Sequence, residues 1–471
     1  MSPSTQATMK TSTSVPAPNA LLEAPVEDRL AAAIGEIVRQ APDRLAIVAQ
    51  AGSDARRAID YGTLAQAIAA LDAALDAARP VGIVARATRV ESLVVIAAAC
   101  GRQHVPVAFL ADDSRDLVGE LRDWVELDDS LTLPPAPAGG RKRLEFETVP
   151  PQVIVATSGT SGPPKLVDHS WDSLLAAARL SEQWHGLGWL LVYDATRWAG
   201  IQVWLQALLT GGRLVVPASR DPDVVARALA DEGVSILPAT PTLLRRLLAS
   251  ADPSLLQKAT LDRITLGGEA ADALLLRQAQ ANFPKAKITQ VYATTELGEV
   301  YRVADGGPGF PATWIGKALP GGARLSLRRD GELLVRLSRD TAEIGTGDLV
   351  ERRGDRYEFT GRRSDVIVVG GAKVYPKRVE ELVRGVPGVV ETRVYGLPSA
   401  VTGELVAGEI VLADPLPEGH TPESVRAAVL KACRDGLEPH SVPRILDLVK
   451  QIATTPAGKT PRKSGAGQPA R

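Results

Sequence analysis

The sequence predicts an α/β protein with a large N-terminal domain and a smaller α+β C-terminal domain. The chain has 471 residues, more than one hydrophobic core usually holds, so two domains are expected. Up to Gly316, apolar segments with strand-like and helical spacing alternate, as in βαβ units on parallel sheets. After Gly316 the segments become short and alternating, with glycine turns between them, which is typical of a small antiparallel β region.

The βαβ pattern begins near Leu30, and its elements can be placed in order. Apolar residues at helical spacing over 64–75 precede a strand-like run at 81–84. A Pro-, Gly- and Ala-rich surface loop at 133–140 interrupts the pattern. The pattern then resumes with strands at 153–155, 213–216, 235–237 and 263–266 and with helices at 243–248 and 271–281.

The second half of the chain gives shorter elements. Strands are predicted at 323–327, 332–337 and 356–360, followed by a boundary near Gly361. Beyond it we expect a strand at 366–369, a helix at 376–384, a strand at 390–395 and a helix at 422–435. The resulting division is a disordered leader at 1–24, a large domain at 25–361, a small domain at 362–463 and a disordered tail at 464–471.

Composition excludes several classes of protein. The 54 basic and 55 acidic residues nearly cancel, so a nucleic-acid-binding surface is not expected. Cys100 and Cys433 are too few for a disulfide framework or a cysteine-rich metal site. No apolar run reaches the length of a membrane span, and the N-terminal segment lacks the apolar core of a signal peptide. We therefore expect a cytoplasmic protein.

Small and hydroxyl-bearing residues form an anion-binding pattern that ends at Lys165. They are Thr157, Ser158, Gly159, Thr160, Ser161 and Gly162. Backbone N–H groups on such a turn can converge on one anion, and the hydroxyls and Lys165 add donors and charge. The pattern is not a Walker A loop, because prolines precede the lysine and Leu166 stands where Ser or Thr would bind Mg²⁺. Taken alone, the segment could equally be a Gly/Ser surface loop.

This segment resembles the phosphate loop of the ATP-dependent adenylate-forming superfamily, which includes acyl- and aryl-CoA ligases, adenylation domains of nonribosomal peptide synthetases, and luciferase. Ser161 and Leu166 depart from the usual pattern. Five further family-like segments follow in the same order as in the superfamily. They lie at 267–270, 292–296, 345–348, 361–376 and 458–462.

The resemblance implies a nucleotide site. Gly268, Glu269 and Ala270 would form the adenine-pocket loop, and Tyr292 would stack on adenine. Asp348 would accept hydrogen bonds from both ribose hydroxyls, a task that suits the several acceptor sites of a carboxylate. Arg362 would contact the nucleotide. Read without the family, Gly347-Asp348 is a turn and the arginines belong to a charged hairpin.

The resemblance also implies the catalytic and metal-binding residues. Thr295 would contact phosphate, and Glu296 would hold Mg²⁺ together with ATP oxygens and water. Lys459 would bridge the carboxylate and the α-phosphate, and Lys165 would assist on the phosphates. Ser364 falls at the hinge position of the mobile C-terminal domain, with Asp365 beside it as the alternative.

The implied reaction is the activation of a carboxylic acid by ATP to an acyl adenylate, followed by transfer to a thiol. That thiol would belong to coenzyme A or to the phosphopantetheine of an acyl carrier protein. A nicotinamide-dependent oxidoreductase is disfavoured, because Gly267-Gly268 lacks the spacing of a dinucleotide-binding fingerprint. A non-catalytic nucleotide-binding homologue remains an alternative.

The acid is expected between the helix after Asp194, the loop at Gly267 and the residues after Glu296. Tyr193 to Trp198 resembles a segment of amino-acid adenylation domains in which the aspartate binds the substrate ammonium group. Asp194 and Glu299 would then favour an amino acid, and Arg197 would either neutralise Asp194 or bind a second substrate carboxylate. The segment at 370–376 is more similar to acyl- and aryl-CoA ligases, so an acyl or aryl acid is favoured and an amino acid is the alternative.

Overall fold

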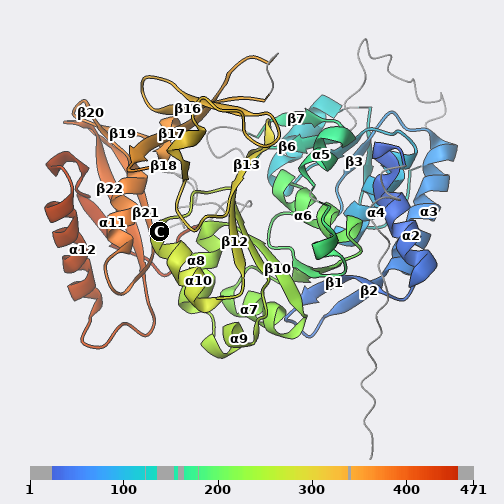
Figure 1. The fold of residues 1–471 in the computed structure, drawn as a ribbon, viewed down its shortest axis with the longest axis horizontal. Coiled ribbons are helices and arrows are strands. Elements are labelled where there is room, and N and C mark those ends of the chain that lie inside the picture. Colours follow the sequence, from blue (N-terminus) through green and yellow to red (C-terminus); the bar gives the residue numbers. More distant parts are fainter. Residues whose placement is uncertain are drawn as a thin grey trace, which may run out of the picture.

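The computed structural model describes residues 24–121, 123–134, 153–157, 164–178, 180–337 and 341–453. Its parts follow one another along the longest axis, from the N-terminal helices to the C-terminal sheet (Figure 1). A large α/β part is followed by a smaller α+β part, which confirms the predicted fold class. The predicted boundary after residue 361 falls inside strand β18 and stays a prediction.

The largest sheet has eight strands in the order β13-β12-β11-β10-β8-β9-β1-β2. Pairs from β12 through to β1 are parallel, and the two edge strands are antiparallel. The bounds are β1 Leu45–Ala51, β2 Arg57–Asp60, β8 Gly188–Leu190, β9 Arg213–Pro217, β10 Val234–Ala239, β11 Arg263–Gly267, β12 Lys287–Thr294 and β13 Gly298–Val303.

A second sheet of five strands has the order β5-β3-β4-β6-β7. Its strands are β3 Ile83–Ala85, β4 Val107–Phe109, β5 Val125–Leu127, β6 Val153–Ala156 and β7 Leu166–His169. Successive side chains of a strand point to opposite faces of its sheet. Ile47 of β1 therefore packs in one hydrophobic core with Ile83 and Val107 of the second sheet. The next residue, Val48, packs in another core on the opposite face of the large sheet.

Helices cover both faces of the large sheet. The core between the two sheets contains α2 Arg29–Gln40, α3 Tyr61–Ala78, α4 Val90–Arg102, α5 Trp171–Ala177 and α6 Trp198–Leu209. The opposite face packs against α7 Pro222–Asp231, α8 Pro241–Ser250, α9 Pro253–Lys258 and α10 Ala273–Asn282. Local sequence fixes these starts: α7, α8 and α9 each have a side-chain N-cap followed by proline, which is preorganised for a first helical turn.

The predicted antiparallel region forms a third sheet in the order β14-β18-β17-β16-β15. Its strands are β14 Phe310–Pro311, β15 Arg324–Leu327, β16 Glu332–Arg336, β17 Ile344–Arg353 and β18 Arg356–Arg362. Strand β17 includes Gly347 and Asp348, although Gly347 has a left-handed φ of +74°. The pairing of β16 with β17 is irregular at this glycine, and pairing with β18 begins at Asp348.

The C-terminal part is a sheet of five strands with two helices. The strand order is β20-β19-β22-β21, with β23 paired to β22. The bounds are β19 Ile367–Val369, β20 Ala372–Val374, α11 Pro376–Arg384, β21 Val389–Ser399, β22 Gly403–Leu412, α12 Pro422–Gly436 and β23 Ile445–Leu448. Val379, Val394 and Val429 join the two helices to the sheet in one core. The predicted helix at 376–384 is confirmed at both ends.

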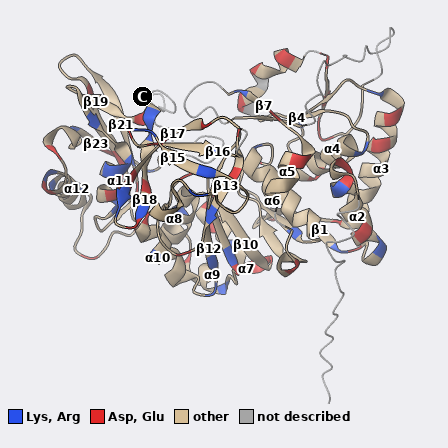
Figure 2. Cartoon of the chain, turned by 45° about the horizontal axis from the view of Figure 1, so that its top comes forward, with Lys and Arg blue, Asp and Glu red and all other residues tan. Residues whose placement is uncertain are grey.

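Short 3-10 helices complete the described chain. They are η1 Val26–Asp28, η2 Asp112–Leu121, η3 Glu182–Trp184, η4 Ala312–Trp314, η5 Arg363–Asp365 and η6 Pro439–Ser441. Within the described ranges, no helix combines the length and apolar character that crossing a membrane requires. Charged residues of both signs are scattered over the surface, and basic residues gather at α11 and β18 (Figure 2).

Candidate active site

The predicted phosphate loop connects β6 to β7. Residues 158–163 lie outside the described residues, but both ends of the loop are described. Thr157 N–H donates to the Lys165 carbonyl at 2.8 Å, and Lys165 N–H donates to Thr157 Oγ1 at 2.9 Å. The loop therefore connects the antiparallel strands β6 and β7, and hydrogen bonds between Thr157 and Lys165 join its two ends. Both residues line the cavity described next.

A cavity of about 800 Å³ lies at the carboxyl ends of the parallel strands. Ligands of open α/β sheets bind at this edge. The sequence-predicted residues that line it come from six segments of the chain. They are Thr157, Lys165, Asp194, Arg197, Trp198, Gly267, Gly268, Glu269, Ala270, Tyr292, Thr295, Glu296, Glu299, Asp348 and Arg362.

Tyr292, Asp348 and Arg362 form one hydrogen-bonded group in this cavity. The Tyr292 hydroxyl donates to Asp348 Oδ2 at 2.6 Å, and Arg362 Nε donates to Asp348 Oδ1 at 3.0 Å. The Tyr292 ring is stacked near Tyr301 and Phe359, with centroid distances of 5.1 and 5.3 Å. Burial, with the nearby Asp348 carboxylate, raises the pKa of Tyr292, so its hydroxyl stays a donor. Each Asp348 oxygen keeps a further acceptor site for a ligand hydroxyl.

Glu332 holds the backbone that carries Asp348, and sequence reasoning missed it. Its Oε1 accepts from Gly347 N–H at 3.0 Å, and its Oε2 accepts from Arg363 at 2.7 Å. Arg328 also contacts this carboxylate. A Cβ on Gly345 would lie 2.7 Å from Glu332 Oε1, so a side chain there would displace this carboxylate. Arg363 itself is exposed, and it forms ion pairs with the exposed Asp330 and the buried Glu332 directly after β18.

The predicted adenine loop follows β11 directly. Gly268 has a φ of +81°, which turns the chain sharply at the strand end. Glu269 accepts from Thr242 Oγ1 at 2.6 Å and from Thr242 N–H at 3.2 Å, at the start of α8. These bonds fix the loop and leave its backbone at the cavity wall.

Glu296 is the candidate metal ligand. Its side chain is exposed at the cavity, and no described residue forms an ion pair or hydrogen bond with it. Among the described residues, no cluster of three or more His, Cys, Asp or Glu side chains could hold a metal ion by itself. A single free carboxylate fits Mg²⁺ that takes its other ligands from phosphate oxygens and water.

Arg197 pairs neither with Asp194 nor with an open site for a substrate carboxylate, the two alternatives considered from the sequence. It is buried, forms an ion pair with Asp113, and donates to the carbonyl oxygens of Ala156 and Thr157. It therefore anchors the first residues of the phosphate loop and does not neutralise Asp194. Asp113 is 84 positions away in the chain, which is why this pair escaped sequence reasoning.

The two carboxylates considered for an amino-acid substrate have protein partners. Asp194 Oδ1 accepts hydrogen bonds from the Thr196 backbone N–H at 2.9 Å and from its hydroxyl at 2.7 Å. Arg220 also interacts electrostatically with Asp194. Glu299 forms an ion pair with Arg302. Both partners reduce the need for a substrate ammonium group.

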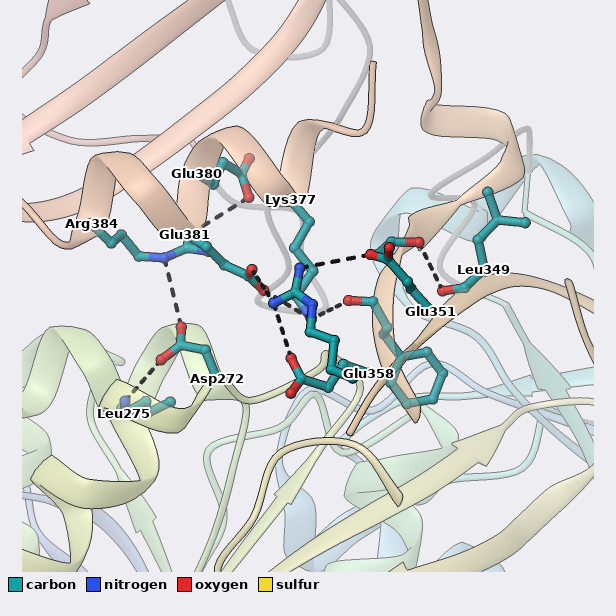
Figure 3. A network of polar contacts seen from close by, with 12 residues as sticks. Asp272, Leu275, Leu349, Glu351, Glu358, Lys377, Glu380, Glu381 and Arg384 are labelled. Atoms are coloured by element: carbon teal, nitrogen blue, oxygen red, sulfur yellow. Dashed lines mark hydrogen bonds and ion pairs between the residues drawn. The ribbon is translucent and has the colours of Figure 1, made fainter. Parts of the chain in front are cut away.

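The C-terminal part meets the large part through charged side chains of α11 (Figure 3). Lys377 Nζ donates to the Phe359 carbonyl at 2.7 Å, and Arg384 lies 3.7 Å from Asp272 at the start of α10. Burial lowers the pKa of Lys377. Asp272 in turn pairs with Arg245 of α8 at 2.7 Å. None of these contacts was anticipated, because each joins two different secondary-structure elements and depends on how the fold packs them together.

The predicted hinge residue lies beside this interface. Ser364 is exposed in η5, between β18 and β19, and its hydroxyl donates to Asp365 Oδ1 at 2.9 Å. Lys459 lies outside the described residues, so its position relative to the cavity is not described.

Two family models match the chain in order along its length. The one described as AMP-binding enzyme matches residues 68–336, and the one described as AMP-binding enzyme C-terminal domain matches residues 378–459. The first covers more than half of the chain.

Relatives and solved structures agree with these matches. A medium/long-chain fatty acid–[acyl-carrier-protein] ligase of Mycobacterium tuberculosis is 25% identical over 67% of this chain and 66% of its own length. The acyl-coenzyme A synthetase ACSM2 of Rattus norvegicus is 27% identical over 66% of this chain and 60% of its own length. The chain thus spans about two thirds of the curated relatives it matches. ATP-bound MatB of Rhodopseudomonas palustris has a similar fold, with a TM-score of 0.68, 20% identity, and coverage of 92% of this chain and 97% of MatB.

Proposed function

Because the chain belongs to the AMP-binding enzyme family, we propose that it uses ATP to convert a carboxylic acid into an acyl adenylate. The acyl group then passes to a thiol, of coenzyme A or of carrier-protein phosphopantetheine. The observation that carries the proposal is the joining of Tyr292, Asp348 and Arg362 at one end of a cavity that continues past Gly267 along the sheet. Such a cavity can hold a nucleotide and an acid end to end.

The nucleotide would lie against the third sheet. Asp348 has acceptor sites for two ribose hydroxyls, and Arg362 supplies positive charge beside them. The backbone at 267–270 would border adenine, with Tyr292 against the ring. Mg²⁺, held through Glu296, would neutralise charge on the phosphate oxygens.

Adenylation needs charge stabilisation more than a nucleophilic side chain. The acid carboxylate attacks the α-phosphorus, the bond to pyrophosphate breaks, and negative charge builds on the phosphoryl oxygens. Lys165, Thr295, Lys459 and the backbone of the loop that begins at Thr157 are the groups proposed to stabilise that charge. Arg197 keeps the base of this loop in place.

Transfer to a thiol requires the site to open on a different side. A rotation of the C-terminal part about Ser364 or Asp365 would withdraw Lys459 and admit the thiol. The polar contacts of Lys377 and Arg384 are among those that such a rotation would have to break.

An acyl or aryl acid is favoured over an amino acid. Asp194 and Glu299 already have partners within the protein. The relatives named above are ligases of fatty or acyl acids, in one case with a carrier protein as acceptor and in the other with coenzyme A. Both thiols therefore remain in the proposal.

Acid-dependent exchange of pyrophosphate into ATP tests the proposal. Panels of aliphatic, aromatic and amino acids should show exchange with members of the first two panels. Binding of ATP without exchange for any acid would instead identify a non-catalytic nucleotide-binding protein. Exchange with amino acids alone would overturn the choice of acid.

A further inference from the structure

The cavity continues from Gly267 along the large sheet as a channel, here called the acid channel. Every second residue of three neighbouring strands lines it: Ile236 and Pro238 of β10, Arg263, Thr265 and Gly267 of β11, and Thr289 and Val291 of β12. Alternate residues of a strand share one face. The other wall is one face of α6, formed by Trp198, Gln202 and Gln206, which are four residues apart.

The acid channel is long enough for an extended acid. Gly267 and Arg263 are at opposite ends of β11, and a strand rises about 3.3 Å per residue, so the two Cα positions are about 13 Å apart. A two- or three-carbon acid would leave most of this length unfilled.

Polar groups close the far end of the channel. Arg263 lies at the level of Ile236, which in turn pairs with Trp189, so all three side chains share one end of the sheet. The Arg263 guanidinium is 5.4 Å from the centre of the Trp184 ring, and the rings of Trp184 and Trp189 meet edge to face at 5.8 Å. The cavity lining at this end thus contains a cation over one indole, with a second indole beside the first.

These groups have hydrogen-bonding capacity that the described protein does not use. Trp184 and Trp189 are 8% and 4% exposed, and their indole Nε1–H groups are buried without a partner. Arg263 Nη2 donates to Gln183 Oε1 at 3.3 Å, and among the described residues no carboxylate lies within ion-pair distance of Arg263. The Gln202 amide oxygen, halfway along the channel, is also buried and unpaired.

An apolar tail would be a poor occupant of this end. It would remove water from the Arg263 guanidinium without replacing a hydrogen bond and would leave both buried indole N–H groups unpaired, which is costly. A carboxylate offers two oxygens and about four acceptor sites, enough for Arg263 and both indoles.

We propose that the acid activated by this protein is a dicarboxylic acid of extended length, whose second carboxylate binds Arg263, Trp184 and Trp189 at the far end of the acid channel. The inference rests on the proposed function, because the first carboxylate is the one that reacts near Gly267. It adds the substrate class and three specificity-determining residues.

Pyrophosphate exchange with matched acids tests the inference. Adipate, suberate and sebacate are compared with hexanoate, octanoate and decanoate, and kcat/KM is measured for each. The wild type should prefer at least one diacid over its matched monoacid. Arg263→Met should lower kcat/KM for that diacid by about 10–100-fold, the range expected for losing a hydrogen-bonded charge, while kcat/KM for the monoacid stays level or rises. Arg263→Lys should restore part of the preference.

One control and one further variant separate specificity from damage to the fold. Arg227→Met changes an exposed arginine of α7 outside the cavity and should leave every value unchanged. Trp189→Phe, within the proposed subsite, keeps an aromatic ring but removes the indole N–H, and should lower kcat/KM for the diacid more than for the monoacid.

Binding of the diacids is also measured by calorimetry, so that the carboxylate subsite can be tested independently of adenylation. If no acid supports exchange but a diacid binds and Arg263→Met abolishes binding, the proposed function fails and the carboxylate subsite stands. If monoacids are used as well as diacids and Arg263→Met changes neither, the inference is overturned and the proposed function stands. Absence of both exchange and diacid binding overturns both.

Discussion

The hydroxyl of Tyr292 donates a 2.6 Å hydrogen bond to the carboxylate of Asp348, joining the large parallel sheet to the antiparallel sheet beside it. Arg362 donates to the other oxygen of the same carboxylate. The bond therefore fixes Asp348 at the cavity in an orientation that leaves one acceptor site free on each oxygen.

Replacing Asp348 by Asn should weaken ATP binding strongly. The substitution removes the charge that faces Arg362 and half of the acceptor capacity, and hydrogen bonds to a charged group contribute about 1.5–3 kcal/mol. We expect the KM for ATP to rise by about 10–100-fold in pyrophosphate exchange. Tyr292→Phe keeps the contacts with Tyr301 and Phe359 and should raise the KM less. An unchanged KM in Asp348→Asn would remove this residue from the nucleotide site.

Glu332 should act as a positioning residue for that site. Glu332→Ala leaves Gly347 N–H and Arg328 without this acceptor and removes one of the two carboxylates that contact Arg363, so we expect the free energy of unfolding to fall by about 1–3 kcal/mol. The KM for ATP should rise while the KM for the acid stays constant, because only the backbone of Asp348 is disturbed. Glu332→Gln keeps an acceptor for Gly347 and should recover part of the loss.

Asp330→Asn is the matched control, since Asp330 is an exposed partner of the same Arg363. Surface ion pairs contribute roughly 0–1 kcal/mol. A similar rise in KM for Asp330→Asn and Glu332→Ala would mean that Arg363, and not the bond to Gly347, determines ATP affinity.

Much of the fold could be predicted because local patterns and tertiary structure agree. Strand β11 and helix α11 follow the predicted ranges closely, since apolar alternation and a proline at the first helical position act over a few residues. The superfamily resemblance and the α/β class are also confirmed. Strand β17 was missed because Gly345 and Gly347 are typical of a turn, and the strand around them is defined by its pairing with neighbouring strands.

Site residues that belong to short motifs could be predicted from the sequence. Contacts between segments that are distant in the sequence could not. Tyr292, Asp348 and Arg362 were expected in one site and lie in one site. Arg197 was read against its sequence neighbour Asp194, but the fold gives it Asp113. The end of the acid channel depends on strand register between β8, β10 and β11, which no single segment reveals.

Lys459 should matter for adenylation alone. This expectation rests on the motif at 458–462, because Lys459 lies outside the described residues. Lys459→Ala should lower pyrophosphate exchange by about 10²–10³-fold, the loss typical of one transition-state donor. Consumption of a presynthesised acyl adenylate should change much less. Exchange at the wild-type rate would exclude Lys459 from the site, and Lys450→Ala is an exposed C-terminal control.

Docking of the C-terminal part should depend on the protonation of Glu391. This residue of β21 is 6% exposed, lines the cavity, and has a buried carboxylate oxygen without a partner. Burial, together with the nearby charge of Glu269 in the large part, raises its pKa from 4.5 to about 7, against the opposing charges of Arg246, Arg245 and Arg384. When the C-terminal part is docked, the Glu391 carboxyl therefore holds its proton more tightly than when the two parts separate and Glu391 is solvated.

The sign of the pH dependence follows from that difference. Because the pKa is raised on docking, the contribution of Glu391 to docking is complete below about pH 4.5 and is lost as the pH rises through about 7. We expect the two parts to separate more readily at about pH 8 than at about pH 6. Glu391→Gln, which mimics the protonated form, should remain docked across this range.

Energy transfer between dyes on Val401→Cys and Asp231→Cys measures the separation, since both native cysteines are buried and both new positions are exposed. Glu423→Gln, on the exposed side of α12, serves as the control and should follow the wild-type pH profile. The same profile for Glu391→Gln and wild type would assign any pH dependence to other groups. Lys377 is then the next candidate, because burial lowers its pKa and the loss of a proton would remove the positive charge from its hydrogen bond to the Phe359 carbonyl.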